Sequence, residues 1–246
     1  MPTRNGNAVR KHGGRAGAPE GHAGAEALTL QQLATNSKRC VCVISTLKSG
    51  VRVECELRAV VKNGIRGAFL LAAFPLALLS GFGRLESLFA FGAQCCALVP
   101  ALPGDYLRIA YYRLTLDRCA PDSRVQFGSF FAHSAARVGS GVYIGSYCVL
   151  GRTSIGDRTQ IASQVQILSG ARQHGRGAGG EILGSDHHRF ESVSIGADCW
   201  IGAGAIVMAE VGAGSTIGAG SVVTKPVPAG SVAVGSPARV IGAAAP

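Results

Sequence analysis

Residues 195–224 read IGADCWIGAGAIVMAEVGAGSTIGAGSVVT, and an aliphatic residue recurs through this stretch at intervals of six. The recurring residues are Ile195, Ile201, Val207, Val211, Ile217 and Val223, with one shorter step before Val211. A small residue follows most of them, as Gly202 follows Ile201. A period of six fits neither an α-helix, with its period of 3.6, nor a strand that alternates every second residue.

The same period fills an earlier block of the chain. Its aliphatic residues are Val138, Ile144, Leu150, Ile155, Ile161 and Ile167, with one shorter step before Ile155. Three short strands and three corners of this length make one triangular coil of about 18 residues. The aliphatic residue of each hexad would point into the prism, and neighbouring coils would satisfy each other's backbone groups. The repeat therefore predicts a mainly-β protein with a parallel β-helix over residues 123–242.

Three short motifs near the end of the repeat add a resemblance. They are Trp-Ile-Gly at 200–202, Val-Thr-Lys at 223–225 and Gly-x-Pro-Ala-Arg-Val-Ile at 235–241. Together with the hexads they resemble the hexapeptide-repeat acyltransferases, in particular bacterial O-acetyltransferases of sugars and exopolysaccharides. The resemblance implies a left-handed β-helix, which is an exception to the usual right-handed crossover. It also implies a homotrimer whose active sites lie between neighbouring prisms.

The period fails between the two blocks, where residues 170–192 form an inserted loop. A loop that leaves a rigid scaffold at one point is a common place for functional residues. His174 lies just after the last regular strand, where the resemblance places a catalytic histidine. An imidazole suits the general base that acyl transfer from a thioester to a hydroxyl requires near neutral pH. The alternative is a solvated loop histidine without a catalytic role.

The same loop holds a second pair of histidines, His187 and His188, beside Asp186. Adjacent side chains point apart, so these two residues are the weaker candidates for the base and could instead orient an acceptor or bind a metal. Asp186 or Glu181 could orient the catalytic imidazole. No metal is expected for the reaction itself.

The resemblance also implies the residues that would hold acetyl-CoA as the acyl donor. Trp200 would flank the pantetheine arm, and the backbone around Ala203 would donate to the carbonyl oxygen. Ala203 and Ala219 would line the path of the arm because small side chains allow close approach. Thr224, Lys225 and Arg239 match the positions that meet the phosphates and the adenine. A solvated corner lysine is the competing interpretation of Lys225.

Three other functions compete with O-acetylation of a saccharide or a lipid-linked saccharide. The first is N-acylation of an amino sugar, which uses the same machinery. The second is a β-helical metal enzyme of the carbonic anhydrase kind, which would need histidines at fixed hexad positions; the regular hexads contain none. The third is a membrane-tethered trimeric scaffold without catalysis, against which the set of His174, Trp200 and Lys225 argues.

The N-terminal half has a different composition. Residues 1–37 are rich in Gly, Ala and Arg without a period, which predicts a disordered tail. Alternating residues predict a short β-hairpin within 38–66. Residues 67–122 contain two uncharged runs, 67–83 and 87–104, followed by the amphipathic segment 105–118. We expect a hydrophobic helical hairpin, either inserted in a membrane or buried as two core helices, and then a helix that lies at the interface or covers the end of the β-helix.

The positive charge belongs to this half. From Ser134 onward there are eight Lys or Arg against six Asp or Glu, which leaves sixteen against eight before it and places most of the net charge of +10 there. No basic helix with interleaved aromatic residues suggests nucleic acid. Basic residues flank both sides of the hydrophobic runs, so we expect the cytoplasmic side of the bacterial inner membrane, or the cytoplasm if the runs are buried. The spacing of the cysteines fits no zinc site and suggests free thiols in a reducing compartment.

Overall fold

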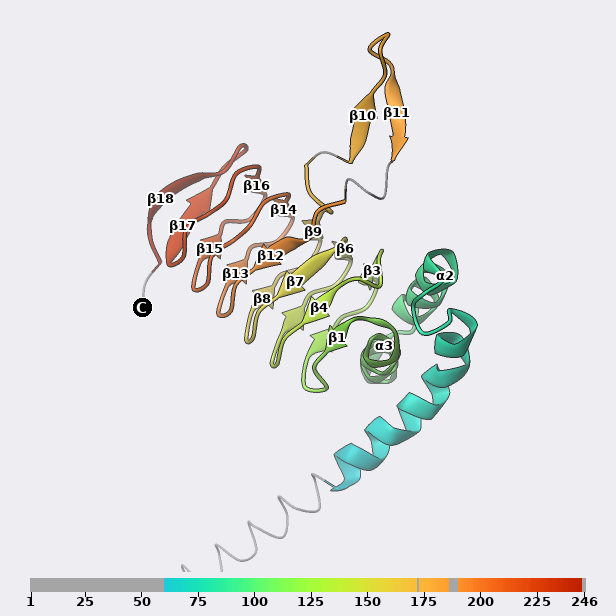
Figure 1. Ribbon diagram of the computed structural model, residues 1–246. Helices are drawn as coiled ribbons and strands as arrows, with labels where there is room; N and C mark the ends of the chain where they lie inside the picture. The colour runs from blue at the N-terminus through green and yellow to red at the C-terminus, as the bar shows by residue number, and fades with distance from the viewer. Residues whose placement is uncertain (1–59, 172, 186–189, 245–246) are drawn as a thin grey trace, which may run out of the picture. The chain divides into compact units, whose positions relative to one another are not determined.

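The computed structural model of the protein describes residues 60–171, 173–185 and 190–244. From Arg118 onward the chain winds as a parallel β-solenoid with three faces (Figure 1). The first four coils contribute one short strand to each face, and the first face then continues through the isolated bridges at Val211 and Val227. The mainly-β class and the parallel solenoid with a helical segment before it are thus confirmed. The left-handed sense of the coil stays a prediction.

The three faces are sheets, which we name A, B and C in the order in which the chain visits them. Sheet A consists of β1 (Arg118–Cys119), β4 (Arg137–Val138), β7 (Thr153–Ile155) and β12 (Val193–Ile195). Sheet B consists of β2 (Arg124–Val125), β5 (Tyr143–Ile144), β8 (Gln160–Ile161), β13 (Trp200–Ile201), β15 (Thr216–Ile217), β17 (Ser231–Val234) and the antiparallel β18 (Arg239–Ala243). Sheet C consists of β3 (Phe130–Phe131), β6 (Val149–Leu150), β9 (Gln166–Ile167), β14 (Ile206–Val207) and β16 (Val222–Val223).

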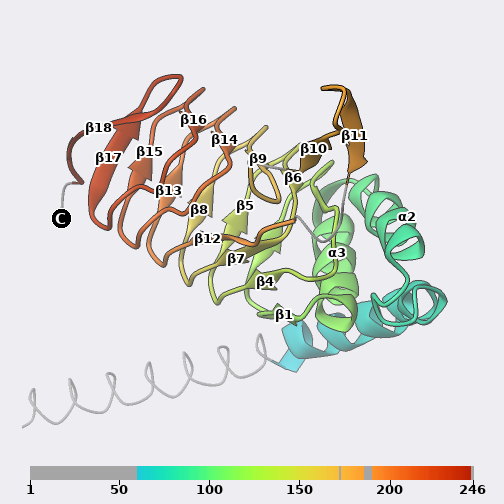
Figure 2. The ribbon, with the colours of Figure 1, turned by 45° about the horizontal axis from the view of Figure 1, so that its top comes forward.

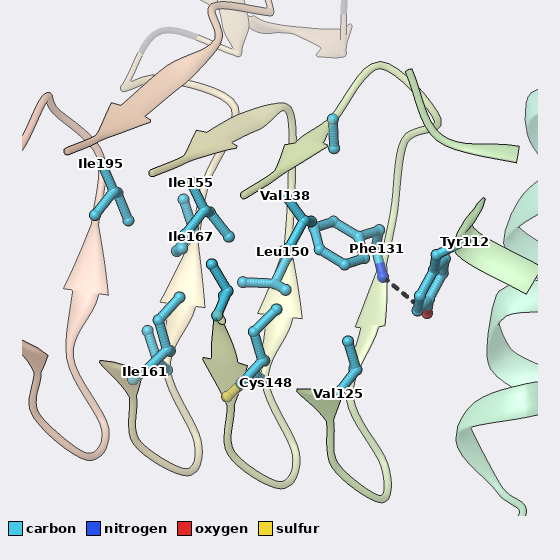
Figure 3. Packing of buried hydrophobic residues seen from close by; sticks show 14 of the residues in the cluster. Tyr112, Val125, Phe131, Val138, Cys148, Leu150, Ile155, Ile161, Ile167 and Ile195 are labelled. Atoms are coloured by element: carbon cyan, nitrogen blue, oxygen red, sulfur yellow. Dashed lines mark hydrogen bonds between the residues drawn. The ribbon is translucent and has the colours of Figure 1, made fainter. Parts of the chain in front are cut away.

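The core of the solenoid is the stack of inward-facing hexad residues. Every recurring aliphatic residue of the two repeat blocks, from Val138 to Val223, is at most 2% exposed. Ile144 pairs in register with Val125 in one neighbouring coil and with Ile161 in the other, so side chains of one face stack in a continuous column (Figure 3). A single coil could not bury this surface alone, and the coils therefore stabilise one another.

The solenoid begins earlier than the predicted residue 123. Its first coil contains Cys119, Val125 and Phe131, which keep the spacing of six and line the prism. Cys119 and Phe131 are not aliphatic, and the next inward residue, Val138, comes seven positions after Phe131. The pattern in this coil was therefore harder to recognise in the sequence.

The small residue after each aliphatic one is required by the neighbouring coil. A Cβ on Gly145 would lie 2.6 Å from backbone atoms of Ala162 and Ser163. A Cβ on Gly202 would lie 2.5 Å from the backbone nitrogen of Ala219. Both distances are too short for carbon, so close approach between coils, rather than a special backbone conformation at the corner, explains the glycine at these positions.

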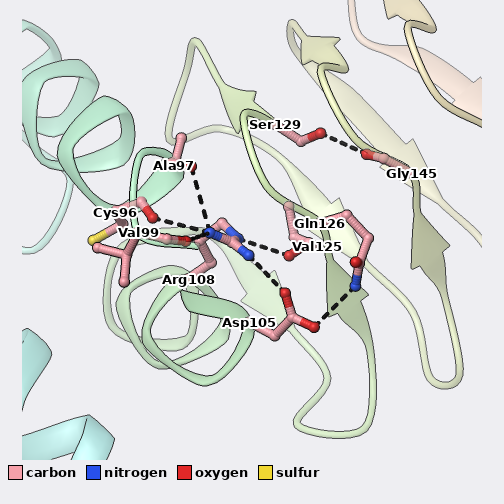
Figure 4. Close-up of polar contacts among 9 residues, drawn as sticks. All are labelled: Cys96, Ala97, Val99, Asp105, Arg108, Val125, Gln126, Ser129 and Gly145. Carbon is pink, nitrogen blue, oxygen red and sulfur yellow. Dashed lines mark hydrogen bonds and ion pairs between the residues drawn. The ribbon is translucent and has the colours of Figure 1, made fainter. Parts of the chain in front are cut away.

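Buried hydroxyl groups connect successive coils at the corners. The hydroxyl of Ser129 donates to the carbonyl of Gly145 at 2.5 Å and accepts from the amide of Cys148 at 2.8 Å (Figure 4). Ser123 and Thr159 donate in the same way to carbonyls of Gly139 and Gly196 in the next coil. These bonds satisfy backbone groups that the short strands leave unpaired.

The described residues before the solenoid form the helix Val60–Leu79, α2 (Glu86–Ala97) and α3 (Ala101–Thr115). The predicted disordered tail and most of the predicted hairpin at 38–66 lie outside the described residues, and residues 60–66 are helical rather than extended. The second uncharged run is divided between α2 and α3 at Pro100, which caps α3. It does not form one long helix.

The amphipathic segment forms α3 and covers the end of the β-helix, as one of its two compatible interpretations predicted; its placement at a membrane interface stays a prediction. Helix α3 covers the open end of the solenoid and packs against β1 and β2. Arg108, Tyr111 and Tyr112 of this helix are all completely buried. The ring of Tyr112 meets that of Phe131 edge-on with centroids 5.0 Å apart, which closes the apolar prism (Figure 3).

Arg108 fastens the helices to the first coil. Its guanidinium donates to the carbonyls of Val125 at 2.7 Å, Val99 at 2.7 Å and Cys96 at 3.1 Å (Figure 4). Its remaining amino group pairs with Asp105 at 2.6 Å. The carbonyls at the end of α2 have no partner within their own helix, and a buried cation is tolerated only where such acceptors surround it.

Replacing Arg108 by methionine should lower the free energy of unfolding by about 3–5 kcal/mol, because Asp105 loses its cationic partner and the carbonyls of Val99 and Val125 lose the guanidinium donor. Guanidinium-induced unfolding followed by circular dichroism measures this. Arg137→Met is the control, since Arg137 is 67% exposed and should change stability by less than about 0.5 kcal/mol. Equal stability of the two variants would contradict the structural role of Arg108.

Gly145→Ala should cost about 1–3 kcal/mol, because the added methyl group meets backbone atoms of the next coil. Gly184→Ala is the matched control, since nothing lies within 4 Å of the added carbon there. Thermal unfolding of both variants tests the close approach of the coils. An unchanged midpoint for Gly145→Ala would show that the coils are farther apart.

Candidate active site

The chain leaves the solenoid at one place among the described residues, the corner between sheets C and A. After β9 it forms a projecting hairpin of β10 (His174–Arg176) and β11 (Ile182–Ser185) and then re-enters sheet A at β12 (Figures 1 and 2). Sheet pairing continues across the insertion, because β12 lies directly beside β7. The insertion therefore adds a hairpin to the corner without disturbing the stack.

His174 opens the hairpin, and its side chain is exposed. Its Nδ1 lies 3.2 Å from the carbonyl oxygen of Leu183 on the opposite strand. A carbonyl can only accept a hydrogen bond, so this contact places the proton of the neutral ring on Nδ1. Nε2 then carries the lone pair, which is the state that a general base requires.

The histidine borders an open pocket of about 500 Å³. The pocket is lined by Leu168, Gly170, Ala171, Gln173, His174 and Met208. Met208 comes from the next coil, where it directly follows β14.

The predicted CoA residues fall into two groups on different corners of the prism. Trp200 lies on sheet B with its side chain 60% exposed. Ala203 and Ala219 occupy equivalent positions in successive coils at the corner between sheets B and C, where the amide of Gly220 donates to the carbonyl of Ala203. Arg239 pairs with Val234 at the C-terminal end of the same corner.

The second group of predicted CoA residues, Thr224 and Lys225, lies on the same corner as His174. The register pairs Val207 with Ile167 and with Val223, so the residues that follow them stack along the corner between sheets C and A. Thr224 and Lys225 therefore lie on the corner from which the hairpin with His174 leaves, and both are exposed. Within one protomer the corner of Trp200 and the corner of His174 are separated by the whole of sheet C.

The remaining histidines and the candidate acidic residues lie outside this pocket or outside the described residues. His133 lies 3.6 Å from the carboxylate of Glu86 at the start of α2, and its ring is 5.1 Å from that of Phe190. These contacts give it a structural position at the base of the helices. His187, His188 and Asp186 lie outside the described residues. Glu181 lies in the turn of the hairpin.

Within residues 60–171, 173–185 and 190–244, no three His, Cys, Asp or Glu side chains are grouped so that they could hold a metal ion. Gln173 and Met208 were not among the site residues predicted from the sequence. Met208 carried a weak signal, because it is a large residue at a hexad position that is small in most coils.

Comparison with known proteins supports the repeat and the fold. Residues 192–225 match the family described as the hexapeptide repeat of succinyl-transferase. No curated protein matches the chain. A solved maltose O-acetyltransferase from Clostridium difficile 630 is 24% identical with a TM-score of 0.52, over 66% of this chain and 90% of that one. The predicted hexapeptide repeat and its solenoid are thus confirmed.

Two further structures have lower TM-scores. A hexapeptide-repeat acetyltransferase from Vibrio cholerae O1 biovar eltor, complexed with acetyl-CoA, is 22% identical with a TM-score of 0.47, over 69% of this chain and 88% of that one. An N-acyltransferase from Bacillus cereus, in complex with an amino-sugar nucleotide and CoA, is 19% identical with a TM-score of 0.39, over 50% of this chain and 71% of that one.

The hydrogen bond to Leu183 predicts the tautomer of His174. In the neutral ring, the ¹⁵N chemical shifts should show a protonated Nδ1 and an unprotonated Nε2, the opposite of the tautomer usual in solution. Selective ¹⁵N-histidine labelling, with His174→Gln to assign the signal, measures this. A protonated Nε2 in the neutral ring would contradict the proposed orientation.

Proposed function

We propose that the protein transfers an acetyl group from acetyl-CoA to a hydroxyl of a saccharide or lipid-linked saccharide, with His174 as the general base. The observation that carries the proposal is the contact between Nδ1 of His174 and the carbonyl of Leu183, beside an open pocket. The hexapeptide-repeat match and the fold shared with a maltose O-acetyltransferase support the reaction class.

The chemistry requires one proton carrier. Nε2 of His174 accepts the proton of the acceptor hydroxyl while its oxygen attacks the thioester carbonyl carbon. The C–S bond then breaks, and the imidazolium returns the proton to the sulfur of CoA. Among the described residues no backbone carbonyl accepts from the amide of Ala203, which leaves this donor available for the negative carbonyl oxygen, as the resemblance implies.

The exposed residues of the two corners suit the parts of CoA. The indole of Trp200 offers a flat surface for the thin pantetheine arm, and Ala203 and Ala219 leave room beside it. Lys225 and Arg239 supply positive charge for the phosphates, with the hydroxyl of Thr224 as a further donor.

A homotrimer would bring the two corners together. His174, Thr224 and Lys225 lie on one corner of the prism, whereas Trp200 lies on sheet B and Ala219 at the corner that follows it. A closed ring of three protomers sets different surfaces of neighbouring copies against each other. One cleft would then contain the histidine of one protomer and the tryptophan of the next.

The helix Val60–Leu79 supports attachment to a membrane. Among the described residues it is the one helix long and apolar enough to cross a bilayer, and only 11% of its most apolar window is buried. Leu71, Phe74 and Leu78 are among its exposed side chains. We place the enzyme at the cytoplasmic side of the bacterial inner membrane, where attachment would concentrate it near a lipid-linked acceptor.

His174→Ala should lower acceptor-dependent release of CoA by about 10²–10⁴-fold, the usual contribution of a general base. The assay combines purified protein, acetyl-CoA and a panel of sugar acceptors. A thiol reagent measures the CoA that is released. Arg176→Ala, on the same exposed strand of the hairpin, is the control and should stay near wild type. Undiminished turnover by His174→Ala would exclude the histidine as the base.

Replacing Leu71, Phe74 and Leu78 together by serine should move the protein from the membrane fraction toward the soluble fraction, because the apolar face that would insert is lost. Ultracentrifugation of lysates without detergent measures this. The control replaces Val240 and Ile241, which are exposed on the far end of the solenoid, and should leave the distribution unchanged. If the wild-type protein is found wholly in the soluble fraction, the proposed membrane attachment is contradicted.

A further inference from the structure

A second pocket lies between the helix Val60–Leu79, α3 and the first turn of the solenoid, residues 121–124. It is open to solvent. The side chains that the argument uses are Lys62, Arg66, Leu70, Leu102, Arg113 and Arg124. The proposed acyl transfer makes no use of any of them.

Positive charge dominates one side of the pocket. Lys62 and Arg66 are four residues apart on one helix face, and Arg113 and Arg124 come from α3 and β2. None of the four forms an ion pair with another residue in the part of the chain that the structure describes.

The carboxylates of the pocket do not cancel this charge. Asp105 is held by Arg108 at 2.6 Å and by the amide of Gln126 at 2.9 Å. Asp122 accepts from the hydroxyl of Ser140, and its pKa is lowered by that bond and, to a smaller extent, by the positive charge of Arg66. The pocket thus has four cations that form no ion pair within the described residues. Against them stands one carboxylate, that of Asp122, since Asp105 is already paired with Arg108.

The charged groups gather around the first turn. The positive charge of Arg66 is near enough to lower the pKa of Asp122, which lies in that turn. Burial raises the pKa of Cys119 to about 12, and the nearby charge of Arg113 opposes this rise. Both cations therefore lie close to the segment that also supplies Arg124.

The other end of the pocket is apolar. Leu70 lies two turns beyond Lys62, and Leu102 lies three turns before Arg113, or about 16 Å along the axis of α3. The rings of Phe69 and Tyr106 stack with centroids 5.5 Å apart and hold the two helices together at this end. Leu102 is 67% exposed and Leu71 is 77% exposed, so the apolar end continues onto the surface.

We propose that this pocket binds the headgroup of an anionic phospholipid, with the phosphate among the four cations and an acyl chain along Leu70 and Leu102. Guanidinium groups match phosphate oxygens in charge and geometry. A free phosphate would use the cations alone and would leave the apolar end without a role. The inference rests on the proposed membrane attachment and does not depend on acyl transfer.

Native mass spectrometry of the full-length protein, released from non-ionic detergent, tests the site. Phosphatidylglycerol should be retained and phosphatidylcholine should not. Arg66→Gln and Arg113→Gln each remove one positive charge, and each should weaken retention of phosphatidylglycerol about fivefold. A basic residue near an anionic membrane usually contributes about this factor to binding. Arg137→Gln, an exposed arginine outside the pocket, is the matched control.

Two further measurements distinguish a site for a lipid from a site for a soluble anion. Leu102→Ser should weaken retention of phosphatidylglycerol, and glycerol phosphate should bind much more weakly than the whole lipid. Equal retention of both lipids, or unchanged retention in Arg66→Gln and Arg113→Gln, would overturn the proposal. If glycerol phosphate binds as tightly as phosphatidylglycerol, the proposal of a lipid site is overturned. The pocket would then be a site for a soluble anion.

The failure of one proposal can be told from the failure of the other. Arg66→Gln and Arg113→Gln should leave the release of CoA with a soluble acceptor unchanged, because neither residue lies at the His174 pocket. A protein that retains the lipid but transfers no acyl group would contradict only the proposed reaction.

Discussion

The stacking of each coil directly on the next determines the rest of the structure. Backbone groups pair between coils along all three faces, which brings the chains so close at the corners that Gly145 and Gly202 admit no side chain. The same stacking places every aliphatic hexad residue in one narrow column, where burial of apolar surface offsets the loss of chain entropy. A solenoid built this way has open ends, and one end must be covered. Helix α3, with the buried Arg108, covers the first coil and satisfies the carbonyls that meet there.

The location of the candidate active site follows from this rigidity. A prism with fixed coil spacing can insert residues only at a corner, and the insertion with His174 leaves one corner while sheet A continues from β7 to β12. The flat faces and straight corners also align exposed side chains of successive coils, as Leu168, Met208 and Thr224 are aligned. One prism presents its corners in different directions. A site that used both His174 and Trp200 would draw them from two copies of the chain, as in the proposed homotrimer.

Much of the solenoid was predictable because its period depends on local geometry that every coil repeats. From Val138 to Val223 the sequence predicted the aliphatic residue that each hexad buries. The first strand of the first coil, at Arg118–Cys119, lay outside the predicted β-helix of 123–242, since Cys119 takes the place of an aliphatic residue there. The burial of Arg108 could not be predicted, since its partners Val99 and Val125 meet only in the folded protein. For the site, the sequence indicated His174 and its loop, but the contact with Leu183 and the contribution of Met208 depend on hairpin and coil pairing.

Mixing two inactive variants tests most directly whether the active site is shared between copies. His174→Ala removes the base on one corner, and Ala219→Trp fills the path of the pantetheine arm on the other. Unfolded together and refolded in equal amounts, they should regain about one quarter of wild-type turnover, because a closed ring then forms clefts with an intact histidine and an intact CoA corner. Neither variant should regain activity when refolded alone. The absence of any regained activity in the mixture, with wild-type protein refolding to full turnover, would contradict a site assembled from two protomers.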